Sequence, residues 1–365
     1  SAAQLRRQRD RAEADAGEAR HCEAEVFEEP PHLALAAFLD HHAIPAVGAL
    51  AACREAALQL RRTVVEFHPG QQLGDHGSCA AALLPVPKHI QITQFPLGPI
   101  WAEWVDAVKN ERSAQDRVLL YLHGGGYLAL SPITHRNITM RLARYAGCRV
   151  LAINYRKAPH YPYPYPLEDS LLAYQWLLDQ GYSPDKIMLA GDSAGGHLTL
   201  SMLLAIRDRG LPMPAGGVCL SPWTDLSCSG ESMRHNRQRD TMIPARRIPA
   251  AARHFANGMP LDDARVSPLY AQLHDLPPLL IHVGDQEVLL HDSTRFADKA
   301  RAQGVDVTLR VWRNAPHVFQ LFAGVVPQST WSLKEIAHFM RKRMGIVEEN
   351  RARTPDLRVA GSSGV

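Results

Sequence analysis

The sequence predicts an α/β fold with a mostly parallel central sheet and helices on both faces. Three observations support this prediction. From residue 90 onward, short apolar runs alternate with amphipathic segments, a pattern typical of parallel strands joined by crossover helices. The apolar run 187–190 passes through a glycine-rich turn directly into a periodic apolar segment. The chain has 365 residues, 46% of them hydrophobic, which is enough for a large buried core.

Charge balance and cysteine usage exclude several classes of protein. The formal net charge is only +3, so no nucleic acid partner is expected, because such a partner requires a concentrated basic face. The six cysteines form no C-x-x-C pair, which favours a reducing compartment. No apolar run approaches the roughly 18 residues needed to cross a bilayer, so no stable membrane insertion is expected. We expect a cytoplasmic protein. Because the chain starts at Ser1 without a methionine, this expectation leaves open whether an upstream segment precedes it.

The expected elements follow in chain order, and they place the sheet in two parts of the chain. A polar tail (1–25) precedes N-terminal cap helices and a linker (26–89). The α/β core is expected at 90–221 and 279–346, with a cap insertion at 222–278 and a loose tail at 347–365. The expected strands are 90–95, 102–108, 118–122, 150–153, 187–190, 217–220, 279–283 and 305–311, and the expected helices are 138–145, 167–178, the stretch from the glycine-rich turn to about 208, 293–303 and 333–343. Ligands of such sheets bind beyond the carboxyl ends of the strands.

Ser193 is the first candidate for a reacting atom. It lies in Gly191-Asp192-Ser193-Ala194-Gly195, between an apolar strand and a helix, which is the context that a G-x-S-x-G nucleophile elbow requires. The glycines are needed because strand and helix backbones crowd together at such a turn. The positive end of the following helix faces the serine and suits an anionic intermediate. For this motif alone, an incidental serine in a glycine-rich turn is the alternative interpretation.

A second motif, His123-Gly124-Gly125-Gly126-Tyr127, follows the apolar strand 118–122. Consecutive glycines at a strand end allow backbone N–H groups to approach a ligand closely, as an oxyanion hole requires. We expect the donors to be the backbone N–H groups of Gly125 and Gly126, together with that of Ala194 after the nucleophile. His123 is expected to brace the loop by hydrogen bonds rather than to act as the base.

Two further segments supply a candidate acid and a candidate base. Asp285 follows an apolar strand and is expected at the same sheet edge as Ser193, where it would orient an imidazole. His317, in a loop after the next strand, completes the chain order Ser, Asp, His. Glu287 is close enough to substitute for Asp285, whereas Asp292 is interpreted as the cap of the next helix.

Four motifs extend this pattern: H-G-G-G-Y at 123–127, N-Y-R-K-A-P at 154–159, G-D-S-A-G-G at 191–196 and S-P-W-T-D-L at 221–226. With the acid and base segments, they resemble the hormone-sensitive-lipase-like family of α/β-hydrolases. The resemblance spans about residues 90–343 and implies an α/β-hydrolase core, a helical cap, no cofactor and no metal, and hydrolysis of carboxylic esters. It also implies structural roles for Asp192 and for Glu168-Asp169. The chain departs from the family pattern at Leu130, where a glycine is usual, and at His160, where an acidic residue is common.

The leading functional hypothesis is a serine carboxylesterase that acts on small esters with short to medium acyl chains. Its acyl-enzyme would form on Ser193, with His317 as the base and Asp285 as the orienting acid. A non-catalytic small-molecule receptor on the same fold is the alternative from another class, and the presence of His317 argues against it. A serine peptidase or amidase would share the same machinery. Monomer and homodimer both remain open.

Overall fold

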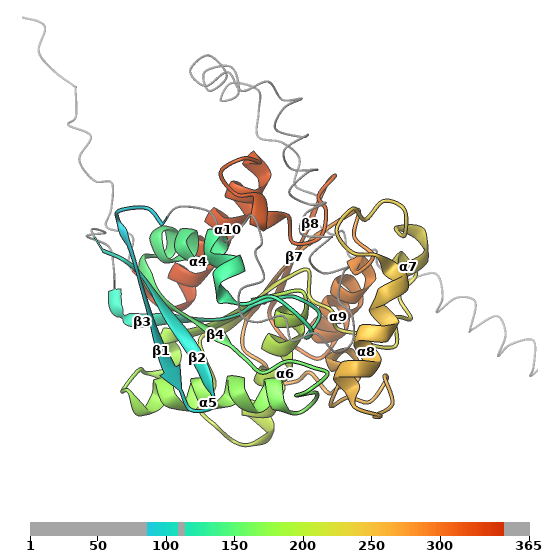
Figure 1. Cartoon of the computed structure of the whole chain (residues 1–365), viewed down its shortest axis with the longest axis horizontal. Coiled ribbons are helices and arrows are strands. Elements are labelled where there is room, and N and C mark those ends of the chain that lie inside the picture. The colour runs from blue at the N-terminus through green and yellow to red at the C-terminus, as the bar shows by residue number, and fades with distance from the viewer. Residues whose placement is uncertain (1–85, 109–113, 347–365) are drawn as a thin grey trace, which may run out of the picture.

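The computed structural model describes residues 86–108 and 114–346. They form one eight-stranded sheet (Figure 1) in the order β1-β2-β4-β3-β5-β6-β7-β8. The strands are β1 (Ile90–Leu97), β2 (Ile100–Ala107), β3 (Ala114–Leu122), β4 (Cys148–Asn154), β5 (Ile187–Asp192), β6 (Gly216–Leu220), β7 (Leu279–Gly284) and β8 (Val307–Trp312). β2 runs antiparallel to both β1 and β4, and all other adjacent strands of the sheet are parallel. The predicted mostly parallel sheet is therefore confirmed.

Helices connect the parallel strands. The α-helices are α4 (Arg136–Leu142), α5 (Tyr165–Asp179), α6 (Ala194–Asp208), α7 (Ser232–His235), α8 (Ile248–Ala256), α9 (Leu290–Ala302) and α10 (Pro327–Arg343). Shorter helical turns are η2 (Pro132–His135), η3 (Ala143–Gly147), η4 (Pro184–Lys186), η5 (Ala245–Arg247), η6 (Pro268–Tyr270) and η7 (Phe319–Phe322). Among the described residues, none of these helices combines the length and apolar character needed to span a membrane.

Two apolar cores lie on opposite faces of the sheet. Alternate residues of β3 point to opposite sides, as the pleat requires: Leu120 joins the core under α5, α6 and α9, whereas Leu119 joins the core under α4 and α10. Figure 1 shows these two helical layers on either side of the strands. The three-layer arrangement holds the carboxyl ends of β3, β5, β6 and β7 next to one another.

Among the helix starts, those of α10 and α9 differ most from the predictions. α10 begins at Pro327, six residues before the predicted start, because proline is favoured in the first turn of a helix. α9 begins at Leu290 and therefore includes Asp292 in its first turn. The interpretation of Asp292 as a helix cap was wrong. Its carboxylate instead accepts a hydrogen bond from the backbone N–H of Asp225 at 2.8 Å.

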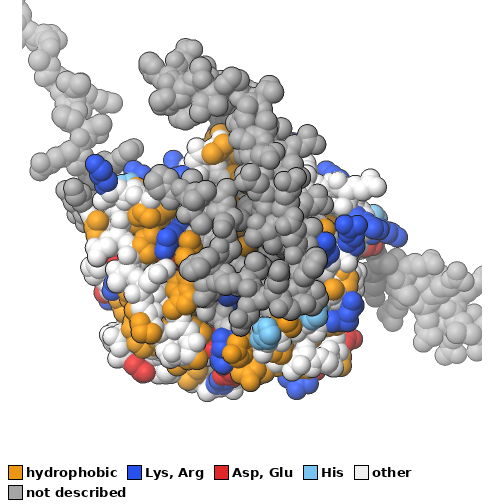
Figure 2. All heavy atoms as spheres, in the orientation of Figure 1, with side chains coloured by type: hydrophobic (Ala, Val, Ile, Leu, Met, Phe, Trp, Pro, Cys, Tyr) orange, Lys and Arg blue, Asp and Glu red, His pale blue; other side chains and the backbone are white. Residues whose placement is uncertain are grey.

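The segment between β6 and β7 contains α7 and α8, which lie beside α9 in Figure 1. It lies in the part of the chain where we expect a cap insertion (222–278), and its role as a cap stays a prediction. Residues 26–85 of the expected N-terminal cap helices and linker (26–89) lie outside the described residues, as do both expected tails, 1–25 and 347–365. Where the described surface is visible in Figure 2, basic, acidic and hydrophobic side chains are interspersed.

Candidate active site

The turn at Ser193 has the strained geometry of a nucleophile elbow. Ser193 adopts φ 54° and ψ −119° between β5 and α6, a left-handed conformation that a non-glycine residue keeps only when its surroundings impose it. Its N–H donates to Leu220 O at 2.8 Å, and its carbonyl accepts from Trp223 N at 3.2 Å. A Cβ at Gly195 would lie 2.0 Å from Leu122 O. The predicted need for glycine at this crowded crossing is confirmed.

The glycine loop after β3 is also held in an unusual conformation. Gly125, Gly126 and Tyr127 have φ values of 117°, 63° and 64°, and a Cβ at Gly125 would lie 2.1 Å from Ala129 O. Leu130, at the position where the related family usually has glycine, also has a positive φ of 70°. The departure noted in the sequence therefore leaves a leucine in the left-handed conformation that glycine adopts most easily.

A buried network joins the start of this loop to the elbow. Asp192 accepts hydrogen bonds from Gly124 N at 3.1 Å and from the Tyr121 hydroxyl at 2.6 Å, and its other oxygen lies 3.2 Å from His135 Nε2. Burial lowers the pKa of His135, but the charge and hydrogen bond of Asp192, together with a hydrogen bond to Ser131 O, outweigh burial, so the pKa is raised overall. His123 Nδ1 lies 2.6 Å from Gly124 O, which fits the expected bracing role. Asp192 has the structural contacts that the resemblance implied.

The carboxylate that contacts His317 belongs to Glu287. His317 Nδ1 lies 2.8 Å from Glu287 Oε2, whereas Asp285 Oδ1 accepts a hydrogen bond from Asn314 N at 2.8 Å. The prediction that Asp285 orients His317 is therefore corrected to Glu287, the alternative named above. The physical reason is the turn after β7. Asp285 N continues the ladder by donating to Trp312 O at 3.0 Å, while Glu287 folds back over the strand end and is fully buried.

Burial and pairing shift both members of this couple. Burial raises the pKa of Glu287, and the hydrogen bond and charge of His317 partly oppose this rise. Burial also lowers the pKa of His317, but the hydrogen bond and charge of Glu287 raise it, with smaller contributions from the charges of Asp240 and Asp192, so the pKa of His317 is raised overall. Because Nδ1 faces a carboxylate, it carries a proton, which leaves Nε2 as the acceptor when the ring is neutral.

Ser221 supports this pair, and the sequence analysis assigned it no role. Its hydroxyl donates to Glu287 Oε1 at 2.7 Å and accepts from Val318 N at 3.2 Å. Gly284 N donates to the same Glu287 oxygen at 2.5 Å. The segment 221–223 thus contacts both the Ser193 elbow, through Trp223, and the loop of His317. The S-P-W-T-D-L motif singled out the segment that contains Ser221, but nothing in the motif indicated that Ser221 contacts Glu287.

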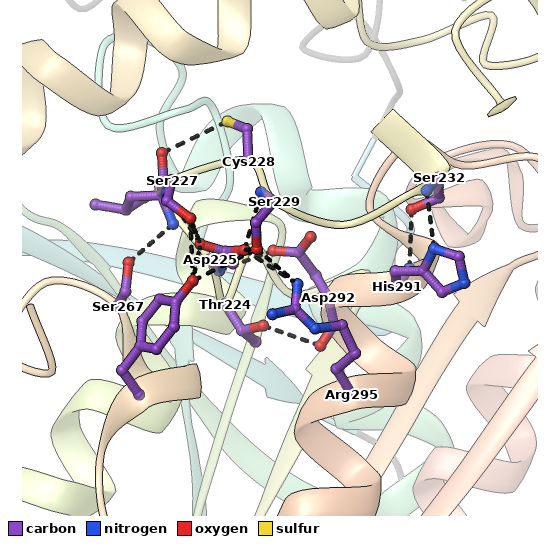
Figure 3. Close-up of polar contacts among 12 residues, drawn as sticks. Thr224, Asp225, Ser227, Cys228, Ser229, Ser232, Ser267, His291, Asp292 and Arg295 are labelled. Atoms are coloured by element: carbon purple, nitrogen blue, oxygen red, sulfur yellow. Dashed lines mark hydrogen bonds and ion pairs between the residues drawn. The ribbon is translucent and has the colours of Figure 1, made fainter. Parts of the chain in front are cut away.

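The same motif continues into the polar cluster of Figure 3, which fixes the segment against α9. Asp225 accepts hydrogen bonds from the hydroxyls of Ser227 and Ser229, at 2.5 and 2.6 Å, and forms an ion pair with Arg295 at 3.1 Å. Asp292 is fully buried beside it, and burial raises its pKa well above the ordinary range. Within 86–108 and 114–346, no three His, Cys, Asp or Glu side chains are grouped to bind a metal ion.

Comparisons with known proteins agree with this geometry. A family model described as "alpha/beta hydrolase fold" matches residues 119–321. An acetyl-hydrolase of Streptomyces hygroscopicus is 36% identical over 280 residues, which cover 77% of this chain and 91% of that protein. An esterase of Acinetobacter venetianus is 33% identical over 70% of this chain and 84% of its own length.

The solved structures include an esterase from the bacterial hormone-sensitive lipase family, which is 39% identical to this chain. It superposes with a TM-score of 0.72 and covers 80% of this chain and 99% of its own. The fold, the matched family model and these relatives lead to one assignment. This chain belongs to the α/β-hydrolase fold family and, within it, to the hormone-sensitive-lipase-like carboxylic ester hydrolases.

Proposed function

We propose that this chain is a serine carboxylesterase that hydrolyses small esters with short to medium acyl chains. Ser193 is the nucleophile, His317 the base and Glu287 the orienting acid. The observation that carries the proposal is the buried 2.8 Å contact between Glu287 and His317, which lies at the strand ends beside the strained elbow of Ser193. A short acyl chain is supported by the name of the Streptomyces relative, an acetyl-hydrolase.

The proposed reaction has two halves. In the first, His317 Nε2 takes the Ser193 proton as Ser193 Oγ attacks the acyl carbon. The backbone N–H groups of Gly125, Gly126 and Ala194 stabilise the oxyanion. The tetrahedral intermediate collapses when the bond to the alcohol oxygen breaks, and His317 gives its proton to that oxygen, so that the alcohol leaves.

In the second half, water replaces the alcohol. His317 takes a proton from the water, whose oxygen attacks the acyl carbon of the acyl-enzyme. Collapse then breaks the bond to Ser193 Oγ, which regains a proton from His317, and the carboxylic acid is released. Glu287 keeps its position throughout, holding the Nδ1 proton and stabilising the imidazolium. The partner is a small ester; a cytoplasmic location and the choice between monomer and homodimer stay predictions.

The direct test combines kinetics with covalent labelling. Wild-type protein is expected to hydrolyse p-nitrophenyl butyrate and to gain one phosphonyl group from an alkyl p-nitrophenyl phosphonate. Ser193→Ala should lose both properties while retaining the melting temperature. Full hydrolysis by Ser193→Ala would refute the proposal. A wild-type protein that hydrolyses neither esters nor anilides would favour the receptor alternative, and faster cleavage of anilides than of esters would favour the amidase.

A further inference from the structure

Tyr127, the residue immediately after the glycine loop, is completely buried between two elements of different parts of the chain. Its ring stacks on that of Phe255 from α8, with centroids 3.8 Å apart and planes at 12°. Its hydroxyl is hydrogen-bonded to His197 Nδ1 on α6. The residue thus connects the loop, the helix that begins at the nucleophile, and the segment between β6 and β7.

The direction of these hydrogen bonds follows from the partners. His197 Nε2 lies 2.9 Å from Val266 O, and a carbonyl oxygen can only accept, so Nε2 carries the proton. Burial lowers the pKa of His197 to about 4, which keeps the ring neutral at working pH. Nδ1 is therefore an acceptor and Tyr127 donates to it. The result is a one-way chain from Tyr127 through His197 to Val266.

This chain of bonds acts where the backbone is strained. Gly125, Gly126 and Tyr127 all have positive φ, and Tyr127 is the one member that lacks glycine's freedom. Such a conformation persists only when its surroundings over-determine it. Besides the side-chain contacts, Tyr127 O accepts a hydrogen bond from Ala158 N at 2.9 Å. The loop that carries the proposed oxyanion donors is thus held at both ends. The hydrogen bond from Gly124 N to Asp192 holds its start, and the Tyr127 side chain holds its end.

We propose that the Tyr127–His197 hydrogen bond positions the oxyanion loop against the nucleophile helix. The inference rests on the proposed esterase function and extends it to two positioning residues. Because His197 lies one helical turn after Ser193, the bond aligns Gly125 and Gly126 with the reacting serine. The Val266 contact further ties this alignment to the segment between β6 and β7. The bond should therefore affect stabilisation of the oxyanion more than substrate binding.

The experiment compares an aryl butyrate with its thiono analogue, in which sulfur replaces the carbonyl oxygen. Sulfur is a weak hydrogen-bond acceptor, so the thiono ester draws little on the oxyanion donors. Tyr127→Phe keeps the ring that stacks on Phe255 and removes only the hydroxyl. We expect kcat for the oxygen ester to fall about tenfold with KM little changed, and kcat for the thiono ester to change less than about twofold.

Two sets of controls separate positioning from general damage. Tyr174→Phe removes another tyrosine hydroxyl, that of Tyr174 on α5, which donates to Pro212 O at 2.6 Å. This control variant should leave the ratio of kcat for the oxygen ester to kcat for the thiono ester unchanged. His197→Gln can accept from Tyr127 and donate to Val266, whereas His197→Leu can do neither. The glutamine variant should therefore retain a higher oxygen-to-thiono ratio than the leucine variant.

An equal loss on both esters in Tyr127→Phe, or no loss on either, would overturn the positioning role. If Tyr127→Phe does not fold, the comparison of His197→Gln with His197→Leu tests the proposal instead. Equal oxygen-to-thiono rate ratios in these two variants would overturn the positioning role. Failure of the proposed function itself would look different, because the wild-type protein would then hydrolyse neither ester.

Discussion

Glu287 Oε2 lies 2.8 Å from His317 Nδ1, and the other oxygen of Glu287 is held by Ser221 and Gly284 N. Every oxygen of this buried carboxylate is therefore occupied by a specific donor. The arrangement fixes the side chain in one rotamer and directs the imidazole. It also accounts for two motifs at once, since S-P-W-T-D-L supplies Ser221 and the strand-end motif supplies Glu287.

The raised pKa of His317 predicts the acidic limb of the pH profile. Only neutral His317 can accept the Ser193 proton, so kcat/KM should fall as pH drops through an apparent pKa above the ordinary histidine value of about 6.5. Glu287→Gln removes the hydrogen-bonding carboxylate that raises this pKa, and the limb should then move to lower pH. Measuring log kcat/KM against pH for both proteins checks the sign. A limb at the same pH in both would contradict the coupling.

Ser221 offers a way to separate alignment of the acid from backbone strain. Its φ of 49° suits glycine better than alanine, yet both Ser221→Gly and Ser221→Ala lose the hydroxyl that contacts Glu287. We expect kcat/KM to fall about tenfold in both variants, equivalent to roughly 1.4 kcal/mol. Urea denaturation should find the glycine variant about 1 kcal/mol more stable than the alanine variant. If kcat/KM instead fell only in the less stable alanine variant, the Ser221 hydroxyl would have no part in aligning Glu287.

Gly195 should tolerate no side chain. A Cβ there would lie 2.0 Å from Leu122 O and 2.7 Å from His123 O, and backbone atoms at the start of the glycine loop cannot move aside cheaply. Gly195→Ala is expected to lower the free energy of unfolding by about 3 kcal/mol or more. Gly210→Ala is the matched control just past the end of the same helix. It has φ 62° and open space, so it should cost about 1 kcal/mol. Comparable losses in the two variants would refute the steric explanation.

Much of this architecture was predictable because its signals are local. The strand, turn and helix around Ser193 follow from an apolar run, a glycine-rich turn and helical periodicity within about 20 residues. The glycine loop was recognisable for the same reason. The alternation of strands and helices predicted that the sheet would be mostly parallel. The order of the eight strands within the sheet was not predictable, because it depends on pairing between segments far apart in the sequence.

The errors and omissions arose where a side chain finds its partner far along the chain. Asp285 was chosen because it directly follows the strand, but the turn after β7 directs Glu287 to His317, 30 residues away. Tyr127 and His197 are 70 residues apart, and Ser221 and Glu287 are 66 apart. No local periodicity encodes such contacts. The start of α10 was missed for a simpler reason, because the proline at residue 327 was not used as a helix-start signal.

The comparison of Glu287→Gln with Asp285→Asn tests the central claim most directly. The two positions are two residues apart, and each change replaces a carboxylate by a nearly isosteric amide. The amide oxygen introduced by Asp285→Asn can still accept the hydrogen bond from Asn314 N. With p-nitrophenyl butyrate, Glu287→Gln should lower kcat/KM by roughly 10²- to 10⁴-fold, while Asp285→Asn should remain within about threefold of wild type. A crippled Asp285→Asn beside an active Glu287→Gln would contradict the assignment.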